Sequence, residues 1–271
     1  MTAVIRRNRV ELGIIAGSGI YAMQGFHIKE EREIVTPFGE PSDRYRIVEI
    51  EGIVTAFLNR HGPSHIIPPH MINYRANIWG FKELGVERII SISAVGGIAD
   101  NMNPGDIVLP DQIIDITSGR SSTFYDGPEV VHIDFTEPYC LEMRDAIIKA
   151  GLKAGVLLID KGTYICTNGP RLESRAEIKA YRALGAHVVG MTGMPEACLS
   201  RELGLCFAGL SVITNYAAGI GKARLTTTEV LETMRGSTSR LKSLLKEACL
   251  LIPQKRSCAC KDVLKEAKMS D

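Results

Sequence analysis

Side chains that donate hydrogen bonds recur in short loops that follow apolar runs of the 271-residue sequence. The donors are Ser18, Arg60, His61, Ser93 and Thr192. Glycines near them let backbone N–H groups approach an anion, and no carboxylate stands among them. Each loop alone also fits an ordinary tight turn or a solvated surface pair. Together they predict one small-anion site, for which phosphate is the natural ligand.

A second pair of polar residues could recognise a purine. Glu173 offers a carboxylate that accepts hydrogen bonds, and the side-chain amide of Asn215 both donates and accepts them. Together these groups could form hydrogen bonds with the polar edge of a purine base. Glu173 also fits a helix start, where a carboxylate is favoured, and Asn215 also fits a simple turn.

The elements that must position these residues alternate between apolar strands and helices. Strands are expected at 12–16, 88–93, 106–110, 156–167, 188–191 and 206–214, a hairpin at 45–59, and helices at 68–84, 138–151, 173–184, 195–203 and 227–251. This order predicts an α/β fold: a single domain with a central mixed, mostly parallel β-sheet flanked by helices. Ligands of such sheets bind beyond the carboxyl ends of the strands. The polar loops are therefore expected to converge.

Composition and charge narrow the class of protein. Hydrophobic residues make up 45% and charged residues 23% of the chain, as in ordinary globular proteins. The formal net charge of +1 gives no electrostatic case for nucleic acid or an anionic membrane as a main partner. The longest uncharged run, residues 203–221, contains polar residues and glycines and is a poor membrane span. A small-molecule partner is expected.

The seven cysteines are an odd number without a CxxC pair, so neither a secreted disulfide framework nor a zinc site is predicted. A reducing cytoplasm is the expected compartment. The domain is expected to cover residues 1–252. Residues 253–271 form a charged tail that we expect to be mobile, and this tail carries Cys258-Ala259-Cys260. The two thiols are either a redox pair or free, and the other cysteines are expected to be small core residues.

A series of motifs carries a resemblance to a known family. The motifs include Arg60-His61-Gly62, Asn73-Tyr74-Arg75-Ala76-Asn77, Phe124-Tyr125-Asp126-Gly127, Gly169-Pro170-Arg171, Met191-Thr192 and Pro195-Glu196. In this order, from about residue 12 to 251, they resemble the methylthioadenosine phosphorylase branch of the trimeric purine nucleoside phosphorylases. The resemblance implies a cytoplasmic pentosyltransferase of purine salvage. It also implies a homotrimer, with a hexamer left open, that uses orthophosphate as co-substrate and no cofactor or metal.

The resemblance assigns roles residue by residue. Phosphate would be held by Ser18, Arg60, His61, Ser93, Ala94 and Thr192. Met191 would lie against the ribose, and Leu172 would line the base pocket. His65 and His132 would flank the 5′ end of the sugar, in part from a neighbouring subunit. Phosphate would attack C1′, with His61 helping to position it and Asn215 stabilising the departing purine.

Departures from the family pattern bear on the substrate. Relatives that take 6-aminopurines have aspartates at the positions of Asn215 and Ala217. Asn215 could donate to O6 and accept from N7–H, and Glu173 could accept from N1–H, which together favour a 6-oxopurine. Thr227 stands near the position where nucleoside phosphorylases use a histidine for the 5′-hydroxyl. A small residue leaves room for a methylthio group, so 5′-methylthioinosine is expected, with inosine and guanosine left open.

Three other functions stay open at this point. The chain could be a methylthioadenosine phosphorylase. It could be a hydrolytic nucleosidase of similar fold, which would need a carboxylate base near C1′. It could also be a nucleoside or phosphate sensor that has lost turnover.

Overall fold

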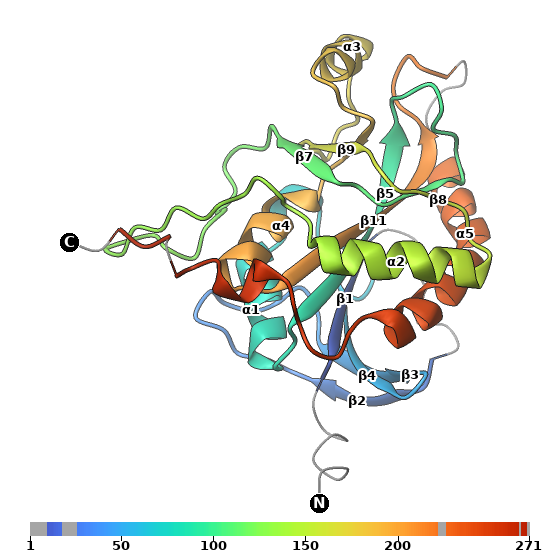
Figure 1. Cartoon of the computed structure of the whole chain (residues 1–271). Helices are drawn as coiled ribbons and strands as arrows, with labels where there is room; N and C mark the ends of the chain where they lie inside the picture. Colours follow the sequence, from blue (N-terminus) through green and yellow to red (C-terminus); the bar gives the residue numbers. More distant parts are fainter. Residues whose placement is uncertain (1–9, 18–25, 222–225, 266, 270–271) are drawn as a thin grey trace, which may run out of the picture.

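The computed structural model describes residues 10–17, 26–221, 226–265 and 267–269 (Figure 1). One large sheet runs through these residues. Its strands are β1 (Leu12–Ala16), β2 (Ile28–Arg32), β3 (Tyr45–Ile50), β4 (Ile53–Asn59), β5 (Arg88–Gly97), β6 (Ile107–Val108), β7 (Gln112–Asp115), β8 (Leu158–Ile159), β9 (Thr163–Cys166), β10 (Val188–Gly190) and β11 (Cys206–Tyr216). The main path is β2-β3-β4-β1-β5-β10-β9-β7, and β11 pairs with β5.

Parallel pairs dominate the centre of the sheet. β1 is parallel to β4 and β5, and β11 is parallel to β5 along nearly its whole length. The hairpin of β3 and β4 and the β5–β10 pair are antiparallel. The predicted α/β class with a mixed, mostly parallel sheet is confirmed.

Helices cover both faces of the sheet, because side chains of the apolar central strands alternate between the two faces. The helices are α1 (Tyr74–Glu83), α2 (Leu141–Ala154), α3 (Arg175–Ala183), α4 (Gly193–Glu202) and α5 (Thr227–Leu251), with the short 3₁₀ turns η2 (Pro69–Met71) and η3 (Ala259–Asp262). Ile14 packs in the core with α2 and α5, whereas its neighbour Ile15 packs with α1 and α4. Figure 1 shows α2 lying across β5 and β11.

Several element bounds differ from the sequence-based prediction. β5 continues through residues 94–97, which were expected to form a loop, and Gly96 and Gly97 pair with β10. A Cβ on Gly97 would lie 2.9 Å from the Met102 carbonyl oxygen, so only glycine fits this close packing. Residues 156–167 are divided between β8 and β9, and β2 and β7 were not predicted. β11 extends to Tyr216, so Asn215 lies within the strand and not in a turn after it.

The C-terminal segment packs against the domain, so the expectation of a mobile tail is wrong for the described part of it. Arg256 Nη1 donates to the Gly204 carbonyl over 2.7 Å, and Cys260 is buried. Lys268 forms a β-bridge with Val131. The domain boundary at residue 252 stays a prediction. Within the described ranges, no helix combines the length and the apolar character needed to cross a bilayer.

Candidate active site

A cavity of about 650 Å³ opens at the carboxyl ends of β4, β10 and β11 and along the middle of β5. Five of the expected phosphate ligands line it: Arg60, His61, Ser93, Ala94 and Thr192. The expected nucleoside contacts that line it are Met191, Leu172, Glu173, Asn215, Ala217, His65 and Thr227. The structure therefore brings together expected site residues that are far apart in the sequence. Arg60 and Thr227, for example, are separated by 167 positions.

The described lining of the cavity does not account for two expected site residues. Ser18 lies outside the described residues, although its neighbour Gly17 lines the cavity. His132 does not line the cavity; its backbone N–H donates to the Ala267 carbonyl of the C-terminal segment over 2.8 Å. Its contribution from a neighbouring subunit stays a prediction.

Arg60 is fully buried and is held by several partners within the chain. Its Nε and Nη2 donate to the Glu196 carboxylate, with Nη2 3.0 Å from Oε2. Nη2 also donates to Ser91 Oγ (2.7 Å), and Nη1 donates to the Ile92 carbonyl (3.1 Å). Of the five guanidinium N–H groups, one on Nη1 is left for an anion. A Cβ on Gly17 would lie 2.7 Å from Nη1, so glycine keeps this approach open.

Glu196 was not predicted to belong to the site, although it stands in one of the motifs. It is completely buried on α4 and also accepts from the Ser91 hydroxyl (2.7 Å). Its charge offsets that of Arg60, and the Glu196 carboxylate raises the pKa of Arg60 against the opposing effect of burial. A buried arginine requires a partner of opposite charge, but the sequence shows neither that Arg60 is buried nor which carboxylate reaches it.

His61 was expected among the hydrogen-bond donors to the anion. Burial, followed by the nearby charge of Arg60, lowers its pKa to about 4, so the imidazole is neutral at pH 7. Nδ1 lies 2.8 Å from the Ile67 carbonyl and must donate to it, because a carbonyl only accepts. Nε2 of the neutral ring is then a hydrogen-bond acceptor.

Two hydroxyl groups complete the described anion end. Ser93 is 8% and Thr192 6% exposed. Ser93 Oγ has one weak partner, Ser211 Oγ at 3.4 Å. Thr192 stands at the N-cap of α4, and its hydroxyl makes no capping hydrogen bond there. Both hydroxyls are thus available to an oxyanion.

Asn215 lines the cavity from β11, which β1 and β5 separate from β4, the strand before Arg60, and its amide orientation is fixed by neighbours. Oδ1 accepts from the Thr214 hydroxyl (2.8 Å), and Nδ2 donates to the Tyr216 carbonyl (2.9 Å). One N–H and one lone pair remain on the amide. Ala217, which follows on the same strand end, is buried and contributes no charge. The base end therefore offers both a donor and an acceptor at Asn215.

Glu173 faces the same end and does not cap a helix. α3 is capped by Ser174, whose side chain accepts from Glu177 N–H while Glu177 returns a bond to the Ser174 N–H. Glu173 Oε1 instead accepts from the Thr167 hydroxyl (3.0 Å). Burial raises the pKa of Glu173 above its ordinary value. Glu173 therefore stands directly before the α3 cap, as the helix-start interpretation expected, but its carboxylate does not act as the cap and is available to a ligand.

Arg120 is a positioning residue that the sequence did not reveal. Its Nη1 donates to the Met191 and Met194 carbonyls, both at 2.7 Å, and its Nη2 donates to the Asn168 carbonyl at 2.9 Å. The guanidinium thereby joins the loop that carries Met191 to the loop that precedes Glu173. Nothing in the local sequence of residues 118–122 distinguishes this arginine from a surface one.

At the remaining end of the cavity, the first turns of α5 contribute Thr227, Val230 and Leu231, which share one helix face. The α5 N-cap is Thr226, whose hydroxyl accepts from Glu229 N–H over 3.2 Å. Thr227 is therefore not needed as a cap. This face of α5 carries no charged or imidazole side chain toward the cavity.

Comparison with known proteins identifies the class that this fold and site define. Residues 11–249 match the phosphorylase superfamily, and the chain belongs to that family. It is 50% identical over 262 residues to a protein of Thermodesulfovibrio yellowstonii named "Probable S-methyl-5'-thioinosine phosphorylase", covering 96% of this chain and 98% of the relative. It is 51% identical over 263 residues to the 6-oxopurine nucleoside phosphorylase of Pyrococcus furiosus, covering 94% and 98%.

A solved structure agrees with this placement. Methylthioadenosine phosphorylase from Schistosoma mansoni in complex with adenine superposes with a TM-score of 0.91 at 31% identity, covering 96% of this chain and 99% of that one. Within the superfamily the chain is an enzyme of the purine nucleoside phosphorylase type, which is a class of pentosyltransferases.

Proposed function

We propose that the chain cleaves the N-glycosidic bond of 6-oxopurine nucleosides with orthophosphate. The preferred substrate is S-methyl-5′-thioinosine, and the products are hypoxanthine and 5-methylthioribose 1-phosphate. The observation that carries the proposal is one cavity lined both by Arg60, which keeps one N–H for an anion, and by Asn215 and Glu173. The name of the Thermodesulfovibrio relative supports the same substrate.

The anion end suits a hydrogenphosphate ion. The remaining Arg60 N–H and the hydroxyls of Ser93 and Thr192 donate to its oxygens. The neutral His61 accepts at Nε2, so it can receive the one O–H that HPO₄²⁻ carries. The oriented ion attacks C1′ as the glycosidic bond lengthens, and its negative charge stabilises the cationic character that develops on the sugar.

The base end suits the departure of a 6-oxopurine. The free N–H of Asn215 donates to O6. As the glycosidic bond breaks, its electron pair passes to the base, N7 takes a proton from solvent, and Oδ1 accepts a hydrogen bond from that N7–H. The ionised Glu173 accepts from N1–H, a proton that adenine lacks. An aspartate in place of Asn215 would face O6 with two acceptors, and an unpaired buried polar group costs about 1–3 kcal/mol.

The methylthio preference rests on the α5 face. Thr227, Val230 and Leu231 offer one hydroxyl and two apolar side chains to the cavity, which suits a thioether better than a 5′-hydroxyl. His65, whose ring lies 4.3 Å from that of His61, is expected near the same end of the sugar. A general 6-oxopurine phosphorylase that takes inosine and guanosine is the second candidate, and the name of the Pyrococcus relative favours it.

A substrate panel tests the proposal. Inosine, guanosine, adenosine and their 5′-methylthio counterparts are each assayed with and without orthophosphate. We expect phosphate-dependent release of purine, fastest from methylthioinosine. Faster turnover of methylthioadenosine would contradict the 6-oxopurine assignment. Release of base without phosphate would instead indicate a hydrolase, and no release at all would indicate a sensor.

We further expect a homotrimer or a hexamer that acts in the cytoplasm and uses no cofactor in this reaction. A trimer would allow His132 to reach the site of a neighbouring subunit. Light scattering coupled to gel filtration gives the assembly mass and decides between these states.

A further inference from the structure

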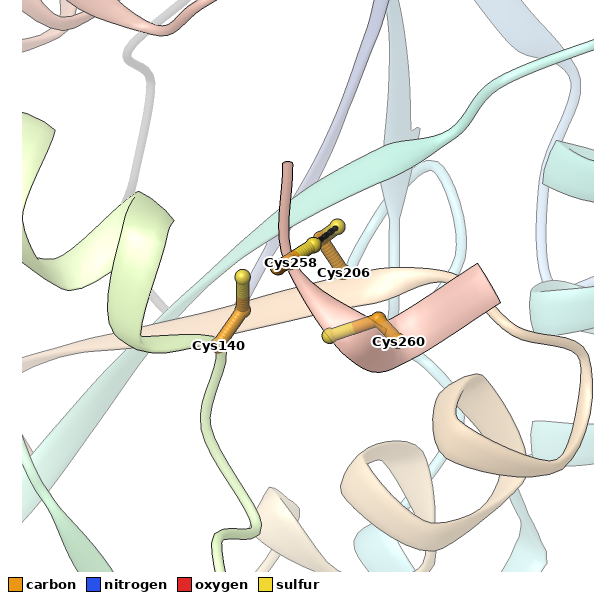
Figure 2. A group of neighbouring side chains, drawn as sticks. All are labelled: Cys140, Cys206, Cys258 and Cys260. Carbon is orange, nitrogen blue, oxygen red and sulfur yellow. Dashed lines mark hydrogen bonds between the residues drawn. The ribbon is translucent and has the colours of Figure 1, made fainter. Parts of the chain in front are cut away.

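Four cysteine side chains meet at the edge of the sheet opposite the nucleoside cavity. Cys140 precedes α2, Cys206 begins β11, and Cys258 and Cys260 lie in the C-terminal segment; their thiols point toward one another (Figure 2). All four sulfur atoms lie within 4.8 Å of one another. Cys206 and Asn215 stand nine residues apart on one strand, which is about 30 Å at the usual rise per residue. The cluster is therefore separate from the active site.

We propose that this cluster is a structural zinc site in which Cys140, Cys206, Cys258 and Cys260 are the four ligands. Tetrahedral zinc with four thiolates places its sulfurs about 3.8 Å apart, given Zn–S bonds of about 2.3 Å. The observed separations reach this geometry with small side-chain movements. Zinc was not predicted from the sequence because the chain has no CxxC pair. In this site two ligands come from distant segments, and the other two come from a CxC pair.

Burial suits a closed, structural site. Cys140, Cys206 and Cys260 are at most 4% exposed, and Cys258 is half-buried. All four cysteines are free thiols in the structure, and Cys206 Sγ lies 3.3 Å from Cys258 Sγ, whereas a disulfide needs about 2.0 Å. The more exposed Cys258 provides the side from which a metal ion enters.

A positively charged side chain contacts the cluster. Arg201 Nη1 donates to Cys260 Sγ over 3.4 Å, as a partner to a metal-bound thiolate would. Arg88, which aligns with Cys206 across the β5–β11 pair, is instead paired with carboxylates, its Nη2 lying 3.7 Å from Glu142 Oε1.

The C-terminal segment is held in the position that this coordination needs. The Ser257 N–H donates to Glu142 Oε2 over 2.8 Å, which ties the residue before Cys258 to the first turn of α2. Arg256 binds the Gly204 carbonyl, two residues before Cys206. Zinc would lock this segment to the domain. Zn²⁺ displaces the thiol protons to solvent and stays divalent, so no oxidant is involved.

Metal content tests the proposal on the full chain. After expression with zinc and purification under reducing conditions, we expect about one zinc per chain by mass spectrometry of the elements. Cys140→Ser and Cys260→Ser should lose it. Cys249→Ser, which changes another buried cysteine that lies outside the cluster, should retain it. Zinc that persists in both cluster variants, or its absence from the wild type, would overturn the assignment.

Two further measurements keep the proposal testable if a variant does not fold. Cobalt added to metal-free wild type should give the strong visible absorption of a tetrahedral tetrathiolate, and a spectrum typical of oxygen ligands would contradict the site. Alkylation after denaturation with a chelator and without a reductant should modify all seven cysteines. Fewer modified thiols would show disulfides and overturn the proposal. Chelation should lower the thermal midpoint by roughly 5 °C or more without reducing phosphorolysis at moderate temperature.

Discussion

At the phosphate end of the cavity, Arg60 and Glu196 are wholly inaccessible to solvent and hold each other with the help of Ser91. At the purine end, Leu172 is 52% exposed, and among the described residues the Glu173 carboxylate accepts a side-chain hydrogen bond from the Thr167 hydroxyl alone. The side chains at the phosphate end are therefore already fixed by one another, whereas those at the purine end keep donors and acceptors free for a ligand. We infer that the type of reaction depends on many coupled residues and the choice of purine on one or two.

The largest effect is expected when the charge that holds Arg60 is removed. Glu196→Gln leaves a buried guanidinium without a counter-charge, so we expect a loss of about 3–5 kcal/mol in unfolding free energy. With Arg60 no longer held, kcat/KM for phosphate should fall by about 100-fold or more. Denaturant unfolding and initial rates at varied phosphate measure these effects.

Glu202→Gln is the matched control, because Glu202 is a buried glutamate on the same helix that accepts from the Phe124 N–H instead of an arginine. An amide oxygen can still accept that bond, so the control should change phosphate kinetics by less than about threefold. Equal effects of the two substitutions would mean that the Arg60–Glu196 pair has no special role.

The purine end is tested by Asn215→Asp. The new carboxylate cannot donate to O6 but can accept from a 6-amino group, so the ratio of kcat/KM for methylthioadenosine over methylthioinosine should rise by roughly 10- to 100-fold. Asn168→Asp makes the same chemical change at a residue that does not line the cavity and should leave the ratio near that of the wild type. An unchanged ratio in Asn215→Asp would refute the recognition argument.

The raised pKa of Glu173 predicts an acid limit for 6-oxopurine substrates. The carboxylate must be ionised to accept from N1–H, so kcat/KM should decline as the pH falls through a pKa above the ordinary 4.5. Glu173→Gln should lose about tenfold in kcat/KM for methylthioinosine at pH 7 and should no longer show the decline at acid pH. If the variant kept this decline, another group would be responsible for it.

The smallest effect is expected at Thr227. Thr227→Val removes a hydroxyl and retains the shape, so methylthioinosine kinetics should change by less than about twofold. Inosine, which could hydrogen-bond this hydroxyl, should lose about fivefold. A larger loss with methylthioinosine would place Thr227 against another part of the substrate.

Local patterns in the sequence predicted the parts of the molecule that follow from local physics. The apolar run at Leu12–Ala16 forms a strand with the expected bounds, and the hairpin around Gly52 is present. The polar loops at strand ends indicated the cavity, because parallel strands bring those ends together. Charge states were harder to predict. The low pKa of His61 depends on burial and on Arg60, and neither can be read from neighbouring residues.

Residues that act through distant partners were also missed. Glu196 is 136 residues from Arg60, and Arg120 is 71 residues from the Met191 carbonyl that it holds. The thiols show the same limitation, since Cys140 is 120 residues from Cys260. Such pairs are set by the tertiary fold, and a single sequence carries no local signal for them.

β11 joins these distant features in one piece of backbone. It begins at Cys206 beside the thiol cluster, pairs with β5 along its length and carries Asn215 near its other end. Its side chains are buried except at Tyr216, and about 30 Å of strand separates Cys206 from Asn215. Because substitutions this far apart usually add independently, changes at the thiol cluster should alter stability without altering the choice of purine.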